Sequence, residues 1–186
     1  MRTPATAALV LAIALSPLTP ATAQRRPIEL GIDMFNFGLL SLDADILGTF
    51  TATNVAIPVG VIRAGFFISD FFAIEPRIYL RYADVEDVGS STNLGLLVGV
   101  PVHFTKDRQK PQGFVRPCMG FYSSSADPGD SYTQLFTGLG VGVKLPVVEM
   151  LSARMEGIWG HYFENDDALG GNSFDVRFGF SFLTRR

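Results

Sequence analysis

The chain has 186 residues, of which 47% are hydrophobic and 18% are charged, and its formal net charge at pH 7 is -3. A balance this close to neutral gives no reason to expect a nucleic-acid partner. The single cysteine, Cys118, excludes an intramolecular disulfide. We interpret it as a small packing residue on a strand.

The N-terminal segment has the pattern of a cleavable signal peptide. Arg2 supplies a positive start, the run 7–15 is apolar, and Ala21-Thr22-Ala23 offers a cleavage site of small residues. The apolar run is much shorter than the roughly 20 residues that a membrane-spanning helix needs. The sequence therefore predicts a signal peptide at 1–23 and, because no linker or composition shift follows, one mature domain at 24–186.

Beyond the signal peptide, apolar residues recur at every second position, which is typical of strands with two different faces. The pattern predicts eight strands, at 28–40, 55–68, 73–86, 93–104, 114–124, 133–145, 151–163 and 173–183. Eight is the smallest usual number of strands for a closed membrane barrel.

The connections between these segments alternate in length. Two are short, at 69–72 and 146–150, and three are longer and polar, at 41–54, 125–132 and 164–172. The connection 105–113 is an exception, being long and basic. The alternation indicates short periplasmic turns and longer external loops, with both termini on the periplasmic side.

Alternation alone does not say which face points inward, since a membrane barrel and a soluble lipocalin-like carrier differ only in that choice. The polar face is rich in glycine, which suits a crowded interior. Lysine, which a soluble domain usually spreads over its surface, is scarce in this chain. We therefore predict an all-β fold, an eight-stranded antiparallel up-and-down transmembrane β-barrel with its apolar face toward lipid.

The inward face carries charges of both signs, and these should pair because an unpaired buried charge costs several kcal/mol. We expect a structural charge network of Glu29, Asp33, Arg63, Glu75, Arg77, Arg81, Arg116, Lys144, Arg154, Glu156, Asp175 and Arg177. Eight strands leave an interior only just filled by side chains, so we predict a filled lumen. Aromatic residues toward the strand ends predict an interfacial belt of Tyr82, Phe104, Phe121, Tyr122 and Trp159.

The stretch 60–82 resembles the strand-turn-strand unit of the small OmpA/OmpX-like outer-membrane barrels, and the segment 174–182 resembles their closing strand. The resemblance covers essentially the whole mature chain. It implies location in the cell outer membrane, contact with outer-membrane lipid and lipopolysaccharide, and insertion by the outer-membrane assembly machinery. Members typically end on an aromatic residue, whereas here four residues, Leu183 to Arg186, follow Phe182.

One segment invites comparison with the outer-membrane lipid A deacylases, which resemble it in placing a His on a late strand, here His161. Their nucleophilic Ser follows two residues later, where this chain has Phe163, and Ser173 is distant in sequence. The other histidine, His103, is predicted near a periplasmic end, and two isolated histidines do not make a metal site. We therefore predict neither catalysis nor a cofactor.

Acidic residues gather in the predicted external loops, where they could hold a divalent cation. They are Asp43, Asp45, Asp127, Asp130, Asp166 and Asp167. Their spacing matches no EF-hand, and solvated loops are usually polar, so no metal site is assigned.

Three functions remain open. The leading one is a noncatalytic, monomeric integral barrel with a structural or loop-mediated interaction role in the cell envelope, with a narrow pore as a variant. The second is a soluble carrier of a hydrophobic ligand, and the third is an outer-membrane lipid-modifying hydrolase.

Overall fold

The structure is a computed structural model that describes residues 26–44, 48–56, 60–85, 89–127 and 131–184. The predicted signal peptide, residues 1–23, lies outside these ranges. Within them, no helix is long and apolar enough to cross a membrane.

The described elements are ten strands. They are β1 (Ile28–Ala44), β2 (Gly48–Ala56), β3 (Val61–Phe67), β4 (Ala73–Val85), β5 (Gly89–Gly99), β6 (Val102–His103), β7 (Gln112–Asp127), β8 (Ser131–Val148), β9 (Leu151–Tyr162) and β10 (Gly171–Leu183).

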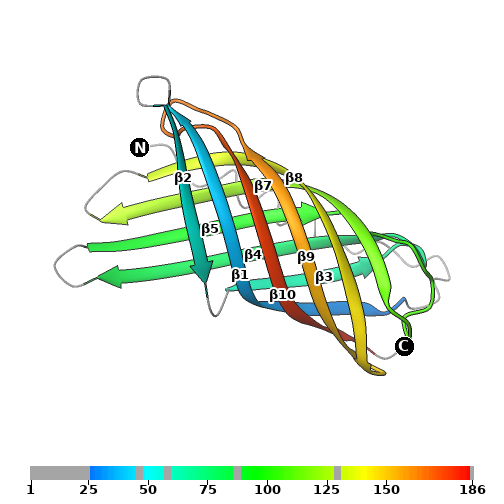
Figure 1. The fold of residues 1–186 in the computed structure, drawn as a ribbon. Coiled ribbons are helices and arrows are strands. Elements are labelled where there is room, and N and C mark those ends of the chain that lie inside the picture. Colours follow the sequence, from blue (N-terminus) through cyan, green and yellow to red (C-terminus); the bar gives the residue numbers. More distant parts are fainter. Residues whose placement is uncertain (1–25, 45–47, 57–59, 86–88, 128–130, 185–186) are drawn as a thin grey trace, which may run out of the picture.

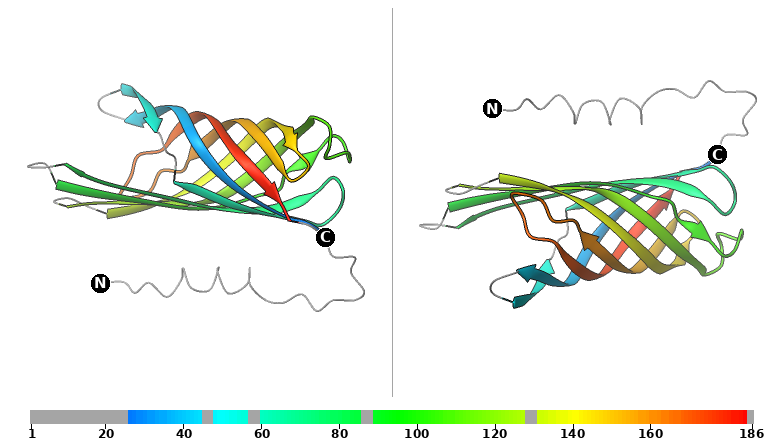
Figure 2. Two further views of the ribbon diagram at one scale, coloured as in Figure 1. Left: turned by 90° about the horizontal axis from the view of Figure 1, so that it is seen from below. Right: turned by 90° about the horizontal axis from the view of Figure 1, so that it is seen from above.

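These strands form one closed antiparallel barrel (Figures 1 and 2). The order is β10-β9-β8-β7-β5-β4-β3-β1, and pairing of β10 with β1 closes the ring. β2 and β3 both pair with β1, and β6 continues β5 along β7, so the ten strands make an eight-stranded barrel. The predicted fold class is confirmed.

The barrel has two distinct ends. We call the end that holds Ile28 and Leu183 the base, and the opposite end the rim. At the base the backbone N–H of Leu183 donates to the carbonyl of Met150 in the β8–β9 turn, and that of Thr184 donates to Ile28. The first strand therefore begins, and the last strand ends, beside the short turns, as predicted.

Several strands run further toward the rim than alternation predicts. β1 has 17 residues, β7 has 16 and β8 has 18. The loops predicted at 41–54 and 125–132 are wrong, because β1 continues to Ala44 and β2 begins at Gly48, while β7 reaches Asp127 and β8 begins at Ser131. An antiparallel ladder pairs through backbone groups, so it continues in polar segments where the apolar alternation has ended.

Two predicted strands are interrupted. The segment 93–104 becomes β5 and β6, separated at Val100 and Pro101, because proline has no N–H to donate to the ladder. The segment 55–68 divides between β2 and β3, opposite a bulge in β1 between Asp33 and Phe35. Nearer the rim than this break, β2 follows β1 and does not pair with β4 (Figure 1).

The outer surface is apolar around the whole circumference. Each barrel strand exposes at least one large apolar side chain, as in Ile32, Ile62, Ile78, Val98, Met119, Val141, Met155 and Phe180. Exposed apolar surface on this scale indicates a solvent other than water. The soluble-carrier hypothesis needed the apolar face inside and is therefore wrong.

The predicted aromatic belt is correct in part. Phe104, Phe121 and Trp159 point outward and are more than half exposed. Tyr122 was assigned to the belt wrongly, because it lies in the barrel interior against Tyr162. On β7 the even-numbered residues point inward, and Tyr122 is one of them. The side chain of Tyr82 lies outside the described part of the structure.

Glycines on the inner face make room for large interior side chains. A Cβ at Gly99 would lie 2.5 Å from Nη1 of Arg116, and one at Gly95 would lie 2.7 Å from Cε1 of Tyr122. The inward glycine face that the sequence predicts therefore has a packing reason. It provides the space that the interior arginines and aromatic rings occupy.

Candidate functional site

The interior between base and rim holds a layer of ion pairs that spans the full width of the barrel. Arg77 on β4 donates from Nη2 to Oε2 of Glu156 on β9, at 2.6 Å. Arg154 on β9 donates from Nη1 to Oε2 of Glu75 on β4, also at 2.6 Å. Since β4 and β9 are four strands apart in either direction around the ring, these bonds cross its diameter.

A third arginine closes the same layer from β7. Nε of Arg116 donates to Oε1 of Glu156 at 2.5 Å and lies 3.9 Å from Oε1 of Glu75. The side chains of Glu75, Arg77 and Arg116 are each 1% exposed. Three arginines thus surround two carboxylates in a region that water does not reach.

Arg63 extends the ion pairs to the β1 side of the barrel, because its partner Asp33 also lies 3.9 Å from Nη1 of Arg77. Nε of Arg63 donates to Oδ1 of Asp33 at 3.1 Å, and its Nη1 donates to Oγ of Ser181 at 2.8 Å. Nη1 also lies 3.4 Å from Oε1 of Glu29. One guanidinium therefore ties β3 to β1 and β10 through charge-assisted bonds, which are the stronger class of hydrogen bond.

Lys144 and the groups around it form a buried cluster at the base of the interior. Nζ of Lys144 donates to Oε2 of Glu29 at 2.6 Å and lies 3.0 Å from Nε2 of His103. The rings of Phe67 and Phe114 pack on the two sides of His103. The sequence placed His103 near this end, and the structure gives it a partner there.

Nearer the rim than the ion pairs lies an apolar layer. Leu97, Cys118, Phe136 and Ile158 are buried together, and Tyr122 and Tyr162 pack against them from the rim side. The Phe136 ring centroid lies 5.0 Å from that of Tyr162 and 5.5 Å from that of Tyr122. Cys118 is buried in this layer, as a small packing residue would be.

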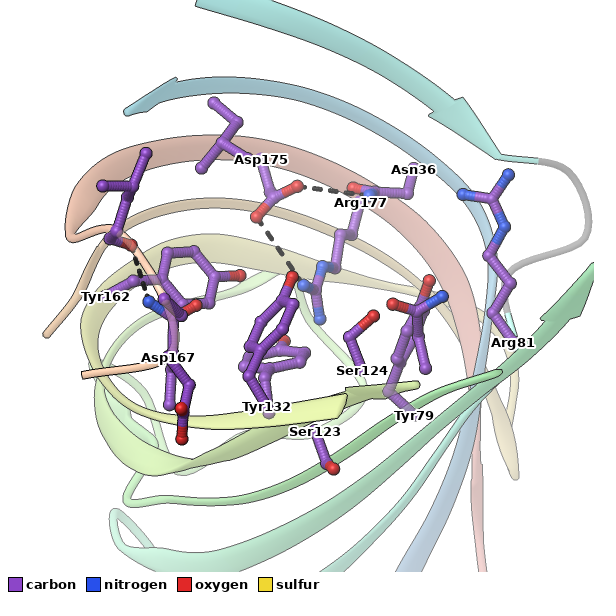
Figure 3. Close-up of a pocket in the computed structure, with 16 residues that line it drawn as sticks. Asn36, Tyr79, Arg81, Ser123, Ser124, Tyr132, Tyr162, Asp167, Asp175 and Arg177 are labelled. Atoms are coloured by element: carbon purple, nitrogen blue, oxygen red, sulfur yellow. Dashed lines mark hydrogen bonds and ion pairs between the residues drawn. The ribbon is translucent and has the colours of Figure 1, made fainter. Parts of the chain in front are cut away.

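The rim end of the interior is a pocket of about 470 Å³ (Figure 3). We call it the rim pocket. It is lined by Asn36, Leu40, Tyr79, Arg81, Asn93, Tyr122, Ser123, Ser124, Tyr132, Gln134, Tyr162, Asp167, Ala168, Leu169, Asp175 and Arg177. The lining combines four tyrosines with amides, hydroxyls and both signs of charge.

The buried wall of the rim pocket is polar. Nη2 of Arg177 lies 3.7 Å from Oδ2 of Asp175, and Nδ2 of Asn36 donates to the other oxygen of that carboxylate at 3.2 Å. Figure 3 shows Asp175 and Arg177 facing each other inside the pocket. Two buried atoms here, Nε of Arg177 and Oδ1 of Asn36, have no hydrogen-bond partner in the described part of the structure.

The twelve residues of the expected charge network divide between these regions. Nine lie in the buried layers near the base and middle, namely Glu29, Asp33, Arg63, Glu75, Arg77, Arg116, Lys144, Arg154 and Glu156. The other three, Arg81, Asp175 and Arg177, line the rim pocket. Arg81 lies on the same face of β4 as the buried Glu75 and Arg77. It is nevertheless exposed, because it is nearer the rim end of the strand.

Sequence reasoning missed the interior aromatic residues. Phe114, Tyr122 and Phe136 share the inward parity of Arg116 and Lys144 on their strands. Extending that parity along each strand would have found them. They were missed because aromatic residues were assumed to lie on the outer face.

In the described part of the structure no hydroxyl is hydrogen-bonded to His161, although Thr137 pairs with it from β8. Its Nδ1 lies 3.1 Å from Oδ1 of Asn172, and its ring packs edge-on against Phe163. Ser173 is close after all, since it pairs with Gly160 on the adjacent strand, but its buried side chain points inward while His161 points outward. The two residues are close in space although distant in sequence, but their side chains lie on opposite faces of the sheet.

The acidic loop residues give little support to a cation site. Asp45 and Asp130 lie outside the described residues, and so do the side chains of Asp43 and Asp127. Asp166 and Asp167 are exposed. In the ranges that the structure covers, no group of three or more His, Cys, Asp and Glu residues is placed to hold a metal ion.

Two solved structures show a similar fold. Neisserial surface protein A (NspA) aligns with a TM-score of 0.59 at 14% identity, over 83% of this chain and 96% of that chain. OprG, an outer membrane protein from Pseudomonas aeruginosa, aligns with a TM-score of 0.52 at 10% identity, over 87% and 97%. No known family profile and no curated protein sequence matches the chain. The fold is that of the small outer-membrane β-barrels, and the apolar exterior fits it.

Proposed function

Starting from this outer-membrane barrel fold, we propose that the chain is a noncatalytic integral barrel with a sealed lumen, whose role in the cell envelope is structural or depends on its rim. One observation supports the seal above all: the ion pairs between β4 and β9 cross the diameter of the ring. Eight strands leave no space for a channel beside such a layer.

The energetics favour a permanent closure over a gate. Glu75 accepts hydrogen bonds from two arginines and Glu156 from three, at 2.5–3.2 Å. Parting them would leave several buried charges without partners, at a cost of about 3–5 kcal/mol for each broken pair. An ion entering the lumen supplies no comparable compensation.

The noncatalytic part of the proposal depends on the surroundings of His161. The hydrolase hypothesis needs a hydroxyl that can transfer its proton to the histidine. The hydrogen-bond partner of His161 is an amide, and Ser173 on the next strand faces the other way. Thr137, which pairs with His161 from β8, makes no hydrogen bond to it among the described residues.

The partners follow from the exterior. We expect outer-membrane lipid around the apolar belt, lipopolysaccharide at the rim, and the outer-membrane assembly machinery during insertion of a monomer preceded by the signal peptide. Full cleavage after Ala23 is tested by mass spectrometry of the protein extracted from outer membranes.

The experiment for the proposal has two readouts on the full chain. A urea-resistant membrane pellet and a gel mobility that changes on boiling are expected for an integral closed barrel. In planar bilayers the folded protein should produce no defined channel openings. A chain that washes off membranes, or one that conducts with steady unit steps, would contradict the proposal.

A further inference from the structure

We propose that the rim pocket binds a neutral saccharide of about disaccharide size. The inference rests on the proposed function, because a pocket that ends blindly requires the sealed lumen beneath it. Its volume of about 470 Å³ lies within the usual range of about 300–1,000 Å³ for small-molecule sites.

The aromatic wall suits a sugar ring. Tyr79, Tyr122 and Tyr162 form a continuous row, with ring centroids 6.1 and 5.4 Å apart, and Tyr132 also lines the pocket (Figure 3). A tyrosine offers a flat apolar face together with a polar hydroxyl. A pyranose has the matching pattern, with a C–H face that stacks on a ring and hydroxyls around its edge.

The two buried atoms without a hydrogen-bond partner favour a ligand that carries hydroxyl groups. Asn36 and Arg177 are 6% and 8% exposed, and the free positions are one acceptor, Oδ1, and one donor, Nε. Both atoms are buried, so a ligand reaches them only when the two side chains adjust on binding; its hydroxyls can then donate to the first and accept from the second. An anion could satisfy only the arginine, a cation only the amide oxygen, and an alkyl chain neither.

The charges of the pocket also favour an uncharged ligand. Arg177 already faces Asp175 at 3.7 Å, and the exposed part of the lining adds Arg81 and Asp167, which have opposite signs. An anionic ligand at Arg177 would therefore meet the carboxylate of Asp175. An apolar ligand would remove water from Asp175 and Arg177 without replacing its hydrogen bonds, which is unfavourable.

The test is a titration of the full mature chain, folded in a detergent without a sugar headgroup. Calorimetry would use maltose, lactose and cellobiose as free disaccharides, and lipid-free core oligosaccharide from lipopolysaccharide. Sodium phosphate and sodium decanoate serve as the anionic and apolar counter-probes. Tyr132→Ala and Arg177→Met alter the pocket, whereas Phe163→Ala removes an exposed aromatic residue of the same end that does not line it.

We expect at least one saccharide to bind, and we expect Tyr132→Ala and Arg177→Met each to weaken its affinity about tenfold, the size of one stacking or hydrogen-bonding contact. Phe163→Ala should change affinity less than about twofold. Binding of a free disaccharide supports the proposal. The core oligosaccharide carries carboxylate and phosphate groups, so its binding without any binding of the disaccharides would contradict a neutral ligand.

The proposal is overturned if no saccharide binds to protein whose heat-dependent gel mobility shows that it is folded, if the two pocket variants leave the affinity unchanged, or if phosphate or decanoate occupies the pocket instead. Because Arg177→Met removes a buried residue, Tyr132→Ala at the exposed rim gives a second, structurally milder variant. Failure here is distinguishable from failure of the sealed barrel, which the bilayer recordings measure separately.

Discussion

The base half and the rim half of the barrel interior use charged residues in opposite ways. Around Glu75 and Glu156, arginines converge at 2.5–3.2 Å and water is excluded. Around Asp175, the single arginine stands 3.7 Å away beside a pocket of about 470 Å³. The same residue types therefore lock one half and leave hydrogen-bonding capacity in the other.

The sealed lumen and the ligand site that we propose would therefore use different parts of one small barrel. The apolar layer around Phe136 and Cys118 separates the two halves. Changes on one side of it should affect folding, and changes on the other side should affect the surface that the barrel presents. The predictions below test that separation in order of expected effect.

The largest effect is expected at Glu156. Glu156→Ala removes the acceptor for Arg77, Arg116 and Arg154 together and leaves their charges buried. The free energy of unfolding in urea should fall by about 3–5 kcal/mol. Glu149→Ala, at an exposed turn of the base, is the matched control and should leave stability nearly unchanged. Equal effects of the two variants would show that the central layer does not stabilise the barrel.

A smaller loss is expected where strands β5 and β7 approach closely. A Cβ at Gly120 would lie 2.6 Å from the backbone Cα of Leu97, which cannot move aside like a side chain. Gly120→Ala should therefore cost about 1–3 kcal/mol through overpacking. At Gly157 the same methyl would meet Phe174 at 3.7 Å and the carbonyl oxygen of Val141 at 4.0 Å, both ordinary contact distances. Gly157→Ala should be tolerated, and denaturation of both variants checks the contrast.

The ion pair of the rim pocket should matter less than the central one. Asp175→Asn keeps the side-chain shape and one oxygen that can accept from Asn36, and it replaces the charge that Arg177 faces at 3.7 Å. We expect a loss of about 1 kcal/mol, the scale of one net hydrogen bond. A loss as large as that of Glu156→Ala would mean that the rim and the base belong to one cooperative network.

The smallest effect is expected at the exposed edge of the pocket. Asp167→Ala alters a side chain in the β9–β10 connection that is open to solvent. Stability should change by less than about 0.5 kcal/mol. A thermal or urea shift beyond that range would show that the connection is part of the folded core.

The sequence predicted the two faces of the strands well, for a simple physical reason. Side chains alternate with period two wherever one face meets lipid and the other meets the lumen. Glu75 and Glu156 were therefore assigned inward from their own strands alone. Their mutual arrangement was not predictable in the same way, because a bond from β4 to β9 depends on ring closure and on the register of every strand between them.

The rim was predicted less well. There the apolar alternation stops while backbone pairing continues, so β1 and β7 were ended too early. The pocket itself depends on Tyr122 pointing inward, which parity along β7 indicates but aromatic composition obscures. The interruption at Pro101 follows from a missing N–H, whereas the bulge near Asp33 has no comparable signal in the residue pattern.

The central claim, a sealed lumen, is tested most directly by the chain's own cysteine. Cys118 is buried between the ion pairs and the tyrosines of the rim pocket. A charged, water-soluble thiol reagent should therefore fail to label Cys118 in the folded protein from either side of a vesicle membrane. In a Cys118→Ala background, Ser124→Cys places a thiol in the rim pocket and should react rapidly from the rim side. Rapid labelling of Cys118 in the folded barrel would show a water-filled path and contradict the account.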